Sequence, residues 1–188
     1  MAKTCSFFGH RKIEETQELK DRLKRVILYL IEEENVRNFL FGSNSDFYTL
    51  CHRIVSELKE MYPDIVRKKY ICRSETCSLV SQKELWAKIY KSINVNEVLW
   101  MEEEVEHDTK WTSGKGQYVE RNQAMIDDSD FCVFYYNALY QPALRKTSKR
   151  DVVPYQPKSG TEVALDYAIR KKRNGKLINF FNVFREED

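Results

Sequence analysis

The sequence has no long apolar run, no paired-cysteine motif and few histidines. No apolar stretch is long enough to span a membrane, and the first residues show no signal peptide, so we expect a cytoplasmic protein with no membrane partner. Three histidines and the lack of a CxxC pair argue against a zinc site, and we predict neither a metal ion nor a cofactor. None of the six glycines belongs to a Walker loop or a GxGxxG fingerprint.

The charge of the chain is nearly balanced. A formal net charge of +2 over 188 residues gives no argument for nucleic acid as a partner. The length predicts one domain, residues 1–188, with a core of its own. An odd number of cysteines at irregular spacing predicts reduced, mostly buried thiols. These cysteines are Cys5, Cys51, Cys72, Cys77 and Cys132.

Short apolar runs alternate with segments of helical periodicity along the chain. The predicted strands cover residues 4–8, 37–41, 65–72, 97–101, 131–136 and 177–181. The predicted helices cover residues 14–34, 46–61, 81–93, 118–127 and 162–172. This alternation predicts an α/β protein in which a mainly parallel sheet lies between helices on both faces.

Two predicted loops, near 107–117 and 137–159, are long for a compact domain. The second loop carries a basic stretch from Arg145 to Arg150. It would act either as a lid over a phosphate site or as a solvated loop.

Three segments are typical of turns from a strand into a helix: residues 7–11, 40–46 and 158–162. In an open α/β sheet such turns gather at the carboxyl edge, where ligands bind. Glycine lets the backbone approach a ligand, and the N–H groups at a helix N-terminus attract anions. The three turns, together with the start of the helix near 118, predict a site for a phosphate-bearing ligand. Its predicted residues are Gly9, His10, Arg11, Gly42, Ser43, Ser45, Asp46, Arg121, Asn122, Ser159, Gly160, Thr161 and Glu162.

Several of these side chains have a second interpretation. Arg11 would either contact a phosphate or pair with a surface carboxylate, and its place in the turn favours the ligand. His10 would bind or titrate there. Helix capping is favoured over catalysis for Asp46. Glu162, in the first turn of its helix, would also be favoured by the helix dipole.

Acidic residues gather before the strand predicted at 131–136. Carboxylates close together can act as general acid and base, or as caps and solvated turn residues. The second interpretation is favoured for Asp127 and Asp128, and both stay open for Asp130.

The order of these motifs resembles the SLOG superfamily, and most closely its YpsA-like branch. The motifs are Gly9-His10-Arg11, then 42–47, then Arg121-Asn122 with the acidic residues 127–130, then Ser159-Gly160-Thr161. The resemblance covers most of the chain apart from the two long loops. It implies a Rossmann-like, three-layer α/β/α fold that binds nucleotides or their derivatives. The family includes LOG phosphoribohydrolases, the DNA-processing protein DprA and sensor domains of bacterial defence systems.

The resemblance leaves two functions open. The first is a binding protein that holds a signalling nucleotide without turnover, as a sensor or a sequestering protein in defence or counter-defence. Its partners would be the ligand, other copies of the chain in a homo-oligomer, and an effector protein. The second is a hydrolase or transferase that acts on the N-glycosidic bond, as in LOG enzymes or nucleoside deoxyribosyltransferases. Ala164 stands where those enzymes carry a glutamate, so the catalytic candidates would be Glu162 and Asp130. Binding of single-stranded DNA, by analogy with DprA, depends only on the basic stretch 145–150.

Overall fold

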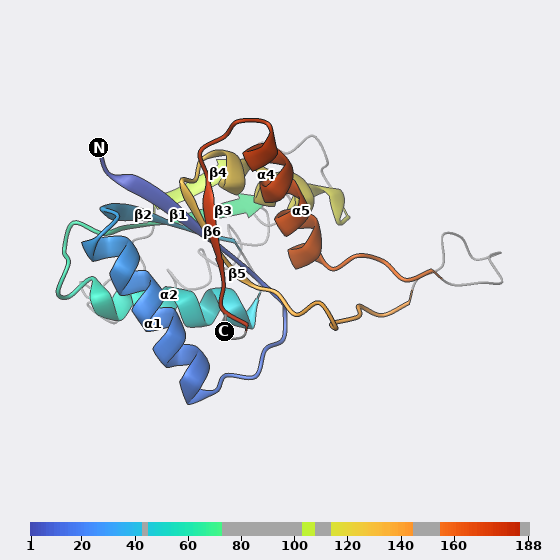
Figure 1. Cartoon of the computed structure of the whole chain (residues 1–188), viewed down its shortest axis with the longest axis horizontal. Helices are drawn as coiled ribbons and strands as arrows, with labels where there is room; N and C mark the ends of the chain where they lie inside the picture. Colours follow the sequence, from blue (N-terminus) through green and yellow to red (C-terminus); the bar gives the residue numbers. More distant parts are fainter. Residues whose placement is uncertain (43–44, 73–102, 108–113, 145–154, 185–188) are drawn as a thin grey trace, which may run out of the picture.

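The fold is a six-stranded sheet between two layers of helices (Figure 1). A computed structural model describes residues 1–42, 45–72, 103–107, 114–144 and 155–184. Its strands are β1 (Lys3–Gly9), β2 (Val36–Phe41), β3 (Val66–Cys72), β4 (Glu103–His107), β5 (Phe131–Tyr135) and β6 (Asn179–Asn182). Its helices are α1 (Gln17–Glu32), α2 (Asp46–Leu58), α4 (Gly116–Asp127) and α5 (Gly160–Arg173).

The strands are parallel and lie in the order β4-β3-β2-β1-β5-β6. The chain moves outward from β1 to β4 on one side and then returns to place β5 on the other side of β1. Since the strands run in one direction, their carboxyl ends share one edge of the sheet. The direction of winding reverses between β1 and β5, and open α/β sheets bind their ligands at such a switch point.

The helices cover both faces of the sheet. α1 and α2 pack beside each other on one face, and α4 and α5 pack beside each other on the other face (Figure 1). α1 begins after Thr16, whose hydroxyl accepts a hydrogen bond from the Leu19 N–H at 3.2 Å. The buried stripe of α1 has helical spacing and consists of Leu19, Leu23, Ile27, Leu30 and Ile31.

The core is rich in phenylalanine on both faces of the sheet. Phe7 and Phe8 are consecutive on β1, so their side chains point to opposite faces, and both are buried. The ring of Phe7 stacks on that of Phe41, with ring centroids 5.2 Å apart. The ring of Phe8 stacks on that of Phe134, also at 5.2 Å. A strand that is buried on both faces favours a continuous apolar run, and β5 has one. β1 is interrupted by the buried Ser6, whose Oγ lies 3.4 Å from the Sγ of Cys132.

The predicted α/β fold with a parallel sheet is confirmed, and the structure adds one strand that the sequence does not predict. β4 lies at 103–107, where the sequence predicts no strand. This strand is at the edge of the sheet and has the sequence Glu-Glu-Val-Glu-His, so it lacks the apolar pattern of the inner strands. The predicted helix at 81–93 and the predicted strand at 97–101 lie outside the described residues.

Four cysteines, Cys5, Cys51, Cys72 and Cys132, are free and buried, as the sequence predicts. Cys77 lies outside the described residues. Burial raises the pKa of the Cys132 thiol to about 12, so it stays protonated and packs as an apolar group. None of the described helices is both long and apolar enough to cross a membrane.

Candidate functional site

The switch point between β1 and β5 is closed by a direct contact. His10 follows β1, and Asn137 lies two residues after the end of β5. The backbone N–H of Asn137 donates a hydrogen bond to Nε2 of His10 at 3.1 Å. This bond requires the lone pair on Nε2, so the imidazole is neutral and its proton is on Nδ1.

His10 lies in an aromatic environment. Only 4% of the residue is exposed. Its ring centroid lies 4.1 Å from that of Tyr140 and 6.1 Å from that of Tyr135. Burial lowers the pKa of His10 from its usual value of 6.5. Protonation would also break the bond from Asn137, so the neutral ring is part of the folded site.

The titration of His10 should make stability depend on pH. Unfolded His10 binds a proton near pH 6.5, whereas folded His10 resists protonation to a lower pH. We therefore expect its contribution to the free energy of unfolding to be complete above pH 6.5 and to be lost as the pH falls toward the folded pKa. Chemical unfolding at a series of pH values measures this, with His10→Asn as the control that lacks the titration. A His10 NMR signal that titrates at or above 6.5 would contradict the assignment.

The turn after β1 is tied to the turn after β2. The Ser45 hydroxyl donates to the carbonyl oxygen of His10 at 3.1 Å, and the Asp46 N–H donates to that of Arg11 at 2.9 Å. Arg11 is exposed. The predicted capping role of Asp46 is wrong: Ser45 holds the N-cap position, and Asp46 is the first residue of α2, 3.7 Å from Lys12 Nζ. Ser43 lies outside the described residues.

A buried arginine lies at the end of β2. Arg121, from α4, is 3% exposed, and its Nη2 donates to Asn122 Oδ1 at 3.1 Å. A Cβ at Gly42 would lie 2.8 Å from Nη2 of Arg121 and 2.9 Å from the hydroxyl oxygen of Tyr48. Burial raises the pKa of the Tyr48 hydroxyl, and its hydrogen bond to Arg121 opposes that change.

The side chains of Tyr48 and Arg121 come from helices on opposite faces of the sheet. Tyr48 belongs to α2 and Arg121 to α4, so they meet beyond the end of β2 at the carboxyl edge. The missing side chain of Gly42 leaves the room in which they meet. The guanidinium and the phenol therefore lie next to the turn that Ser45 joins to His10.

The third predicted turn forms the N-terminus of α5. Ser159 is the N-cap, and its hydroxyl accepts from the Glu162 N–H at 3.0 Å. A Cβ at Gly160 would meet nothing within 4 Å among the described residues, so its backbone is accessible. Thr161 is 5% exposed, whereas the Glu162 carboxylate lies 3.3 Å from Lys158 Nζ. Glu162 is thus held at the surface by a lysine.

Gly9 is required for packing. A Cβ at this position would lie 2.3 Å from Cγ of Phe47, which is completely buried in α2. The close approach of β1 to α2 therefore needs a glycine here, and the contact of Gly9 with a ligand stays a prediction.

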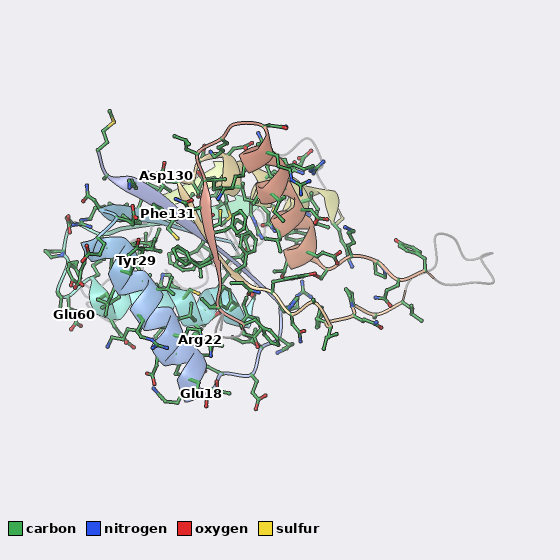
Figure 2. All side chains as sticks on the ribbon, in the orientation of Figure 1. Glu18, Arg22, Tyr29, Glu60, Asp130 and Phe131 are labelled. Carbon is green, nitrogen blue, oxygen red and sulfur yellow. The ribbon has the colours of Figure 1, made fainter. Side chains whose placement is uncertain are left out.

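The structure does not bring Asp130 to this site. Asp130 precedes β5, so it lies at the amino edge, where Figure 2 shows it near the start of β1. Its Oδ2 accepts from the Thr4 N–H at 2.9 Å. Asp127 and Asp128 have structural partners, as expected: they accept from the hydroxyls of Tyr167 at 2.8 Å and Tyr70 at 2.6 Å.

Sequence analysis missed Asn137, Tyr140 and Tyr48. Asn137 could have been identified from the sequence, because it follows the apolar run of β5 much as His10 follows β1. No sequence pattern identifies Tyr140 or Tyr48, because their roles depend on side-chain packing between distant segments.

Within the described residues, no three His, Cys, Asp or Glu side chains gather as a group that could hold a metal ion. In comparisons with known proteins, the chain matches no family model and no curated protein. What the carboxyl edge of the sheet binds must therefore be argued from its own residues.

Proposed function

We propose that the chain binds a nucleotide or a nucleotide-derived signalling molecule at the carboxyl edge of the sheet and releases it unchanged. The observation that carries the proposal is the buried guanidinium of Arg121 beside Gly42. Arginine is suited to phosphate because its donors form a planar fork, and burial strengthens each charged hydrogen bond. The same edge includes the switch point between β1 and β5, where the rings of Tyr135 and Tyr140 lie beside that of His10.

The N-terminus of α5 supports a second contact to the same ligand. The Ser159 hydroxyl already accepts the hydrogen bond of the Glu162 N–H, while the backbone of Gly160 is accessible to a ligand. The partial positive charge at a helix N-terminus favours a phosphate group. Thr161 would add a hydroxyl at this position.

The alanine at position 164 of α5, where the related glycosidases carry a glutamate, supports binding without turnover. Thr161 and Ala164 are three residues apart on α5, so they share a face, and both are buried. An alanine at 164 can neither attack an anomeric carbon nor move a proton. Glu162 lies off this face and pairs with Lys158. The resemblance to SLOG proteins fits a sensor or sequestering protein, with an effector or a second copy of the chain as its partner.

We expect a bound nucleotide to be recovered intact. The purified protein is heat-denatured and the released small molecules are identified by mass spectrometry. A second sample of the folded protein is incubated overnight with nucleoside monophosphates and cyclic dinucleotides, and the products are separated by chromatography. A raised melting temperature with unchanged ligand supports the proposal. Release of free base, abolished in Glu162→Gln, would instead support an N-glycosidic hydrolase or transferase.

A further inference from the structure

The segment after β5 is held in place by side chains from two other parts of the chain. Asn182, at the end of β6, bonds both backbone groups of Tyr136: its Oδ1 accepts the N–H at 3.0 Å, and its Nδ2 donates to the carbonyl at 3.1 Å. His10 then accepts the next N–H, that of Asn137. The chain therefore leaves the sheet along a fixed path.

Asn137 also folds the residues that follow it into a turn. Its Oδ1 accepts from the Leu139 N–H at 2.9 Å, and its carbonyl oxygen accepts from the Tyr140 N–H at 3.1 Å. An asparagine that bonds its own backbone two residues on is a stable turn former. This turn places Tyr140 against His10 without any helix or strand.

The ring of Tyr140 is supported on one side and open to solvent elsewhere. Its plane is tilted by 31° to that of His10, with centroids 4.1 Å apart, so the rings are partly stacked. Tyr140 is nevertheless 41% exposed, whereas His10 is 4% exposed. A fixed aromatic ring with an exposed surface can stack with a planar ring of a ligand.

We propose that Tyr140 is the stacking platform for the base of the bound molecule, so that the ligand class is a phosphate ester carrying a nucleobase rather than a sugar phosphate. The inference rests on the proposed function, which supplies the phosphate contact at Arg121. Tyr140 lies after β5 and Arg121 near the end of β2, the strands on either side of β1. The two residues would hold the base and the phosphate of one molecule.

The neighbouring exposed residue Tyr155 provides a matched control. It is 46% exposed and belongs to the segment that returns toward α5. Tyr155→Leu therefore removes a similarly exposed aromatic ring from a nearby place without touching the turn at His10.

The experiment compares dissociation constants for AMP, GMP, CMP and UMP with that for ribose 5-phosphate, measured by calorimetry. We expect at least one nucleotide to bind roughly tenfold to a hundredfold more tightly than ribose 5-phosphate, since a stacked base contributes that much. Y140L should bring this ratio close to one, while Y140F and Y155L keep it. Melting temperatures near that of the unchanged protein show that each variant is folded.

The outcomes separate the two proposals. If ribose 5-phosphate binds the unchanged protein as tightly as every nucleotide, or if Y140L keeps the ratio, the stacking role is wrong while the phosphate site stands. If neither the nucleotides nor ribose 5-phosphate bind, the proposed function fails as well.

Discussion

Replacing Gly9 by valine is expected to destabilise the protein by about 3 kcal/mol, the upper part of the usual range for overpacking. A Cβ there would lie 2.3 to 2.5 Å from three carbon atoms of the Phe47 side chain. Phe47 is completely buried against Tyr135, at a centroid distance of 5.6 Å, so it has no space into which to move. The melting temperature should fall by about 6–12 °C for a domain of this size.

Gly160 is the matched control for this prediction. A Cβ at Gly160 meets nothing within 4 Å among the described residues, and the position starts α5. Gly160→Ala should therefore leave stability unchanged or raise it by about 0.4–1 kcal/mol, because the unfolded chain loses entropy. The double variant Gly9→Val with Phe47→Leu should recover part of the loss seen in Gly9→Val alone. Equal melting temperatures for Gly9→Val and the unchanged protein would contradict the prediction and show that α2 can shift away from β1.

The sheet was predictable from the sequence where a strand is buried on both faces, as β5 is. Such strands need continuous apolar runs, and β5, with the sequence Phe-Cys-Val-Phe-Tyr, has one. β4 has a single apolar residue and, among the described strands, pairs with β3, so no hydrophobic pattern marks it. The position of β4 is set by its pairing with a distant segment, and local hydrophobic periodicity does not show such a pairing.

The site was predictable only in part, because it depends on which edge of the sheet each residue reaches and on side-chain packing between distant segments. His10 and Ser45 follow strands and meet at the carboxyl edge, as the sequence indicates. Asp130 precedes its strand and so reaches the opposite edge, a distinction that the direction of a parallel strand provides. Gly9 shows another limit: a close approach to a ligand and a close approach to Phe47 both require glycine, and the sequence does not distinguish them.

Replacing Arg121 by methionine is expected to weaken nucleotide binding about 10- to 100-fold while leaving the fold intact. A charged hydrogen bond is worth about 1.5–3 kcal/mol, which sets the size of the loss. Methionine keeps an unbranched stem of similar length, so the space beside Gly42 and Tyr48 stays filled, whereas alanine would leave a cavity. Because the Tyr48 hydroxyl and the Asn122 amide oxygen lose a hydrogen-bond partner, we also expect the free energy of unfolding to fall by about 1–3 kcal/mol.

The affinity for AMP and the melting temperature of Arg121→Met together show what Arg121 does. If the guanidinium binds phosphate, Arg121→Met should lose affinity for AMP in calorimetry while the protein stays folded, with only a modest fall in its melting temperature. If its hydrogen bond to Tyr48 is purely structural, stability should fall and affinity should not. Arg170→Met is the control for a general change of charge, because Arg170 is exposed near the C-terminal end of α5, with its Cζ 5.7 Å from the Tyr167 ring centroid. A folded Arg121→Met protein that binds AMP as tightly as the unchanged chain would overturn the phosphate site, because Arg121 is the buried cation on which that site depends.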